Sequence, residues 1–158
     1  MGVVDIETVI NKDKKFRFEI ETEKLCTINC RCGIVIESPD AIYKICIVDP
    51  IFVIMTEDRA FRDGALLVDP AMIDERRENN IIAYDWKGNY LWNIGDLVGD
   101  IKMPFRGVGY ISHKEAEEEY GVKVKNPSNI LFECIAGGFA FIIDATEKKL
   151  LLKVGGMR

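Results

Sequence analysis

The sequence has very little histidine and no segment that looks like a linker. His113 is the only histidine among 158 residues, and only five residues are proline. A mechanism that uses two histidines, such as that of a two-histidine ribonuclease, is therefore excluded. Because no stretch is rich in proline, glycine and serine and none is of low complexity, we expect a single globular domain over residues 1–158.

Long hydrophobic runs are also absent. No apolar run reaches the roughly 18–20 residues of a membrane-spanning helix. The first residues, MGVVDIETVINKDKK, include early acidic residues and lack the apolar centre of a secretory signal. We therefore expect a cytoplasmic protein that has no membrane partner. Its cysteines are odd in number, at positions 26, 30, 32, 46 and 134, and reduced thiols are the simplest interpretation.

Basic charge is slightly scarce. The chain has 21 lysines and arginines against 26 acidic residues, a formal net charge of −5. Residues 1–79 carry the whole imbalance, with 11 basic and 16 acidic residues, whereas residues 80–158 carry ten of each. Nucleic-acid binding, which needs a clustered basic surface, is not expected. A basic protein partner fits the charge better, although a small negative charge also serves solubility alone.

Alternating and β-branched segments predict a β-rich fold. Expected strands cover 16–21, 33–37, 41–48, 51–55, 80–85, 90–94, 130–135, 139–144 and 149–154. Pro50 is expected at a bend or a sheet edge, because proline cannot donate to a strand ladder. The short connections predict an α+β, β-dominated fold, in which a twisted antiparallel sheet forms a hairpin meander. The nearly continuous apolar run 139–143 favours a central strand.

Two short helices are expected on the connections. Asp69-Pro70 has the form of a helix start, which predicts a helix over 70–78. Ser112 and Glu115 fit a capping box, and Gly121 suits the left-handed position after a helix, which predicts a helix over 113–120. The turn pattern that follows Asp85 recurs after Asp144, as in propeller blades, but two copies are too few for a closed propeller.

The cysteine cluster is one candidate metal site. Cys26-x3-Cys30-x-Cys32 resembles half of a zinc site, and Cys46 or Cys134 would have to complete it. Free cysteine also behaves as a small buried hydrophobe, so packing in the core is the favoured alternative. We therefore expect no cofactor and no metal.

Acidic residues and glycines offer weaker signals. Asp96 and Asp100 lie in the segment GDLVGD, expected to be a loop, and Glu117 and Glu118 lie on the acidic helix. Paired acids can hold a divalent metal, but the ligand spacing of a calcium loop is missing. Gly107-x-Gly109 lacks the lysine and the full spacing of a phosphate loop.

Trp86 is the sharpest clue to binding. Asn80–Ile94, NIIAYDWKGNYLWNI, predicts two strands joined by a turn, with Trp86 and Lys87 at its tip. Exposed tryptophan is unfavourable unless something covers it, and tryptophan is enriched at interface hot spots. Coverage by residues 95–110 is the alternative. Trp92 is expected in the core, in alternation with Tyr90 and Ile94.

Two segments of the chain carry a resemblance to known proteins: AYDWKGNYLWNI (83–94) and FIIDATEKKLLLK (141–153). They resemble segments of a group of small bacterial proteins, some of which are the immunity proteins of polymorphic toxins. The resemblance covers about 75 residues. It implies a compact, cytoplasmic, acidic, β-rich protein that occludes a toxin by binding, and it identifies no binding residue.

The leading hypothesis is therefore a non-enzymatic interaction protein that binds a basic toxin domain. The expected interface residues are Trp86, Lys87, Asp96, Asp100, Glu117 and Glu118. The alternative is a small-molecule-binding β domain with an aromatic pocket. Its lining would be Phe16, Phe18, Tyr84, Tyr90, Trp92, Phe132, Phe139 and Phe141. An enzyme that uses aspartate or glutamate with a metal is a third hypothesis.

Overall fold

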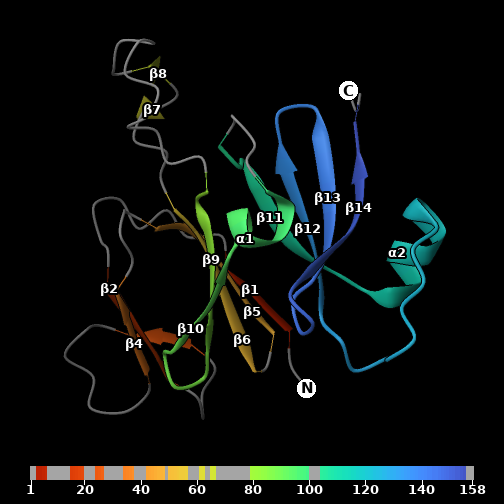
Figure 1. Ribbon diagram of the computed structural model, residues 1–158. Helices are drawn as coiled ribbons and strands as arrows, with labels where there is room; N and C mark the ends of the chain where they lie inside the picture. The colour runs from red at the N-terminus through yellow and green to blue at the C-terminus, as the bar shows by residue number, and fades with distance from the viewer. Residues whose placement is uncertain are drawn as a thin grey trace.

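The computed structural model describes residues 3–6, 15–19, 24–26, 34–37, 42–48, 50–56, 61–62, 65–66, 79–99 and 104–155 (Figure 1). In its N-terminal part the strands are β1 (Val3–Ile6), β2 (Lys15–Glu19), β3 (Lys24–Cys26), β4 (Ile34–Glu37), β5 (Ile42–Val48), β6 (Ile51–Thr56), β7 (Phe61–Arg62) and β8 (Ala65–Leu66). These are followed by β9 (Ile81–Asp85), β10 (Tyr90–Asn93), α1 (Ile94–Val98), β11 (Gly107–Ile111), α2 (His113–Tyr120), β12 (Leu131–Ala136), β13 (Phe139–Asp144) and β14 (Lys149–Val154).

The fold is α+β and β-dominated, as predicted, and the described strand pairs are antiparallel. The strands form more than one sheet. The large sheet has the order β1-β5-β6-β9-β10, and the C-terminal sheet is the simple meander β11-β12-β13-β14. A smaller sheet, β3-β2-β4, and the pair β7-β8 complete the described strands. The predicted hairpins β9–β10 and β13–β14 are both present.

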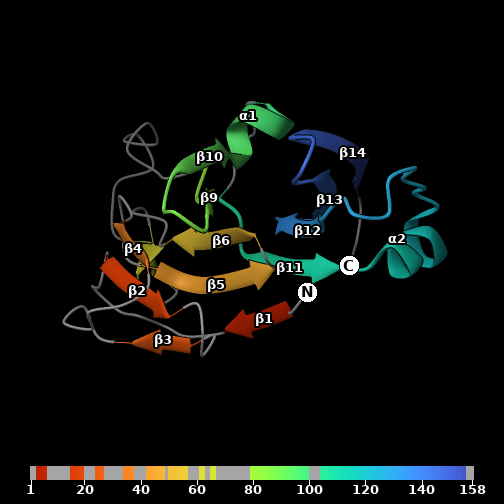
Figure 2. The same cartoon turned by 90° about the horizontal axis from the view of Figure 1, so that it is seen from below.

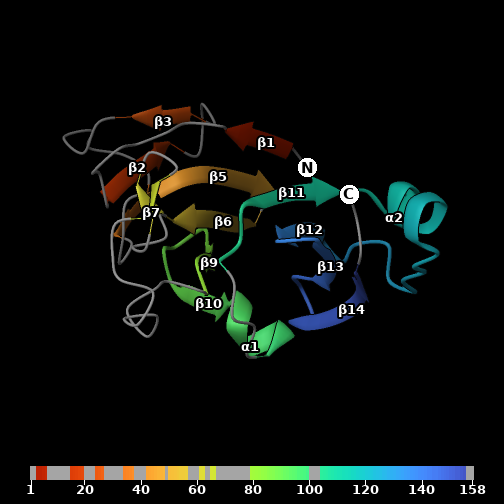
Figure 3. The same ribbon diagram turned by 90° about the horizontal axis from the view of Figure 1, so that it is seen from above.

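The two larger sheets share one hydrophobic core. Val53 and Trp92 of the large sheet pack in the same cluster as Phe132 and Phe141 of the C-terminal sheet. Figures 2 and 3 show β11 running beside β5, where the two sheets meet. The opposite face of the large sheet forms a second cluster, which contains Phe52 and is joined by Ile36 of β4. The central strand β6 is thus buried on both faces.

Most predicted strands are confirmed, with small shifts at their ends. Pro50 is exposed in the turn between β5 and β6, as predicted. In this turn its missing N–H leaves no strand-ladder hydrogen bond unmade. β13 lies between β12 and β14 and is buried along almost all its length, as its apolar run predicts. The predicted helix over 70–78 lies outside the described residues.

Helix α2 occupies the predicted residues, with the predicted caps. The side chains of Ser112 and Glu115 each accept a hydrogen bond from the other residue's backbone N–H, and Gly121 adopts φ 70°.

The expected loop over 95–110 is wrong at both ends. Asn93 caps α1, and its capping box is closed by Asp96, which therefore lies on a helix and not in a loop. Gly107 and Gly109 lie inside β11, paired with β12, which is not the strand-to-helix turn that a phosphate loop needs. The predicted strand over 90–94 included Ile94, which is the first residue of α1, and the residues after it were taken for a loop.

Candidate functional site

The turn between β9 and β10 is held by Asp85. Its Oδ1 accepts hydrogen bonds from the backbone N–H of Lys87, at 2.8 Å, and of Asn89, at 2.9 Å. The bond from Asn89 is the main reason why the pKa of Asp85 lies below its usual value. Gly88 adopts φ 83°, a conformation that glycine tolerates well. The predicted Asp–turn–Gly chemistry therefore produces a tight, well-fixed hairpin tip.

Trp86 lies against the large sheet. Its side chain is half-buried, and its ring centroid lies 5.6 Å from that of Phe52 on β6. It packs on the second core cluster, so residues of the same chain already bury part of its surface. Lys87 is exposed at the tip.

Tyr90 is the large hydrophobic side chain that the described residues leave most open, with 58% of its surface exposed. Its ring meets that of Tyr84 edge-on, at a centroid distance of 6.5 Å. Its hydroxyl donates a hydrogen bond of 3.0 Å to Oδ2 of Asp96, which also accepts the backbone N–H of Asn93. Partial burial and this carboxylate raise the pKa of Tyr90. The exposed ring is thus held in one orientation by an aromatic neighbour and a carboxylate.

A bulge in β10 explains why Tyr90 is exposed while Trp92 is buried. Tyr90 pairs with Tyr84, whereas Trp92 pairs with Ala83, so two steps on β10 match one on β9. This extra residue turns Tyr90 and Trp92 to opposite faces, although simple alternation would put them on one. Trp92 is buried, as expected, and so is Ile94, whereas Tyr90 is exposed.

The proposed interface residues fall on separate parts of the molecule. Trp86 and Lys87 belong to the β9–β10 hairpin, and Asp96 belongs to α1. We call these three residues, together with Tyr90, the hairpin surface. Glu117 and Glu118 are exposed on α2, which lies beyond the C-terminal sheet, away from that hairpin (Figure 1). Asp100 lies outside the described residues.

Helix α2 is fastened to the C-terminal sheet by polar contacts as well as by Ala116. The Tyr120 hydroxyl donates a short hydrogen bond to the Glu133 carboxylate on β12. This bond is the main cause that raises the pKa of Tyr120 to about 12. His113, half-buried at the start of the helix, donates from Nε2 to the Asn129 carbonyl, at 2.6 Å. Its ring is therefore engaged in positioning the helix.

Tyr120→Phe is expected to remove the tyrosine that titrates near pH 12 and to cost about 1 kcal/mol of stability at pH 7. Because the folded pKa is raised, the contribution is complete below about pH 10 and is lost as the pH rises toward 12. Spectrophotometric titration and urea unfolding measure both effects. Tyr110→Phe, whose hydroxyl makes no hydrogen bond to the described residues, is the control. An unchanged alkaline titration in the Tyr120 variant would contradict the assignment.

The cysteines that the structure describes with their side chains are both buried. Cys46 donates a weak hydrogen bond of 3.6 Å from Sγ to the Val108 carbonyl, and burial raises the pKa of Cys134. Both pack in the shared core. Cys26 ends β3, and Cys30 and Cys32 lie outside the described residues. Within the described part of the chain, no group of three metal-ligating side chains occurs.

The residues of the hypothetical aromatic pocket are distributed over both faces of the large sheet. Trp92, Phe132 and Phe141 are buried in the shared core, whereas Tyr84 is buried in the second cluster. Phe139 is half-buried, Tyr90 faces outward, and the side chains of Phe16 and Phe18 lie outside the described residues. This separation gives little support to a single aromatic pocket.

The chain matches no family model, no curated protein and no solved structure. None of the helices in the described ranges has the length and apolarity needed to cross a membrane.

Proposed function

We propose that this protein is a non-enzymatic interaction module that binds and occludes a basic protein domain through its hairpin surface. The exposed Tyr90 ring, fixed between Tyr84 and Asp96, is the observation that carries the proposal. Tyrosine supplies a large contact area at a small cost in conformational entropy, and here much of that entropy is already lost.

The neighbouring charges favour a cationic partner group. A guanidinium or ammonium group binds to the face of a tyrosine ring, and a carboxylate beside the ring adds an ion pair. Asp96 is exposed on α1 and contacts the Tyr90 hydroxyl, so both elements are available in one place. The net charge of −5 would steer a basic partner toward the chain from a distance.

We further propose that the partner is a toxin domain, which makes this chain an immunity protein. The support is the resemblance of residues 83–94 and 141–153 to such proteins, together with the acidic balance. A toxin domain encoded by a neighbouring gene is the partner to test first.

Tyr90→Ala is expected to weaken binding to that domain about 30-fold, because an exposed aromatic anchor is worth about 2 kcal/mol at an interface. Asp96→Asn keeps the acceptor for the Tyr90 hydroxyl and removes the charge, so it is expected to slow association and to reduce its dependence on salt. Biolayer interferometry with purified proteins measures both rates. Lys114→Gln, on α2, is the control for unrelated surface changes.

The same variants separate binding from protection. Cells that express the toxin domain are expected to survive with the wild-type chain and with Lys114→Gln, and to lose protection with Tyr90→Ala. Equal binding by the wild type and Tyr90→Ala would refute the hairpin surface. A bound partner that is harmless to cells would refute the immunity role while leaving the interaction intact.

A further inference from the structure

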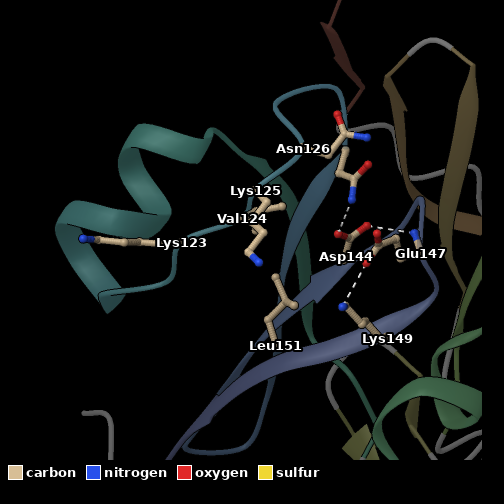
Figure 4. Close-up of a pocket in the computed structure, with 9 residues that line it drawn as sticks. Lys123, Val124, Lys125, Asn126, Asp144, Glu147, Lys149 and Leu151 are labelled. Carbon is tan, nitrogen blue, oxygen red and sulfur yellow. Dashed lines mark hydrogen bonds and ion pairs between the residues drawn. The ribbon is translucent and has the colours of Figure 1, made fainter.

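A cavity of about 390 Å³ lies between the α2–β12 connection and the β13–β14 hairpin (Figure 4). The connection contributes residues 123–126 and Asn129, and the hairpin contributes Asp144, Glu147, Lys149 and Leu151. It belongs to the C-terminal sheet and shares no residue with the hairpin surface.

The two acidic groups in this cavity are already satisfied within the chain. Asp144 is fully buried, and its carboxylate accepts hydrogen bonds from Asn129 Nδ2, at 2.8 Å, and from the Glu147 backbone, at 2.9 Å. The Glu147 carboxylate lies 2.9 Å from the Lys149 ammonium group, and this bond and Asn129 hold its pKa below the usual value. Neither carboxylate therefore needs a cation from solution.

The basic groups are not matched in the same way. The lining holds three lysines and two carboxylates, and Lys123 is paired with Glu117 outside the lining. Lys125 is exposed and pairs with no carboxylate of the described residues. The Lys149 ammonium group has three N–H donors and uses one of them to bind Glu147. Lys123 extends away from Asp144 and Glu147 in Figure 4 and lies 3.6 Å from Glu117.

Apolar side chains provide the rest of the lining. Val124 and Leu151 are both half-buried, and both pack at the edge of the cluster formed under α2. Lys125 lines the same cavity as Val124 and Leu151, so charged and apolar side chains share its wall. A cavity of this volume accepts a small molecule.

We propose that this cavity binds a small organic anion, with its carboxylate or phosphate head on Lys125 and Lys149 and its short apolar arm against Val124 and Leu151. Charge-assisted hydrogen bonds from two ammonium groups give the head its affinity. Apolar contact with the wall then distinguishes an organic anion from an inorganic one. This site does not depend on the interaction proposed for the hairpin surface.

The test is a titration of the isotope-labelled protein with butyl phosphate, butyrate, inorganic phosphate and butylammonium, followed by NMR. Backbone amides at 123–126 and 147–149 are expected to shift with the two organic anions, more weakly with inorganic phosphate, and not with butylammonium. The stronger of butyl phosphate and butyrate identifies the head group. No shift with either organic anion, or equal shifts with butylammonium, would overturn the proposal.

Variants locate the site. Lys125→Gln is expected to weaken binding of the better organic anion about tenfold, since one charge-assisted contact is lost. Lys125→Arg retains the charge and is expected to stay within about threefold of the wild type. Lys114→Gln removes another exposed lysine, which lies outside the cavity, and is expected to change little. Equal affinities for Lys125→Gln and Lys114→Gln would refute the assignment to this cavity.

Discussion

Asn80→Asp is expected to reduce the free energy of unfolding by about 4 kcal/mol at pH 7. Asn80 is buried, and its Nδ2 donates to the carbonyl oxygens of Thr56 and Phe105, both at 2.9 Å. Its Oδ1 accepts the Phe105 backbone N–H at 2.8 Å. Aspartate keeps the accepting oxygen but turns a charged oxygen toward two carbonyl oxygens. One amide thus ties the end of β6 to the chain that enters β11.

The pH dependence distinguishes this explanation from a simple loss of packing. A buried carboxylate has a raised pKa in the folded state, so the destabilisation should diminish as the pH falls and the group becomes protonated. Urea unfolding at pH 7 and at pH 5 measures the difference. Asn126→Asp is the matched control, because exposed Asn126 uses its Oδ1 as an acceptor for Ser128, a role that aspartate retains. A change below about 1 kcal/mol in the Asn80 variant would show that the amide is dispensable.

Local chemistry determined the parts of the fold that the sequence predicts well. The Ser112 capping box specifies the start of α2 and Gly121 specifies its end. Asp85 and Gly88 specify the β9–β10 turn. The division into several sheets depends instead on pairings between distant strands, such as β1 with β5. Alternation of apolar and polar residues does not encode which strand becomes the neighbour, so a single sheet was the simpler prediction.

The candidate site was only partly predictable, for one geometric reason. The segment and its aromatic content were identified, but Trp86 was favoured over Tyr90. The bulge between Tyr90 and Trp92 reverses the face of Tyr90, and no residue type in the sequence marks it. Trp86, in the turn after β9, instead contacts Phe52 on β6, and these two residues lie far apart in sequence. Asp96 was selected for its charge, and its role beside Tyr90 follows from the capping box that begins α1.

Trp92→Ala is expected to cost about 4 kcal/mol, because it leaves a large cavity where the two sheets meet. Trp92 is 2% exposed on β10, and its Nε1 donates to the Ala145 carbonyl beyond β13, at 3.2 Å. Trp92→Phe keeps much of the volume and loses this bond, so a cost of about 2 kcal/mol is expected. Thermal and urea unfolding measure both. Trp86→Ala, at a half-buried position, is the comparison and is expected to cost less than half as much as Trp92→Ala.

The same variants test whether residues 1–158 form one domain, as the sequence predicts. In Trp92→Phe, Trp86 is the sole tryptophan, so its fluorescence reports on the large sheet alone. Hydrogen exchange of the β13 amides reports on the C-terminal sheet. If the shared core joins both sheets into one cooperative unit, fluorescence and hydrogen exchange will report the same decrease in the free energy of unfolding. Unchanged protection in β13 would instead mean that the C-terminal meander is stable by itself, and that the Trp92 contact only docks two independent units.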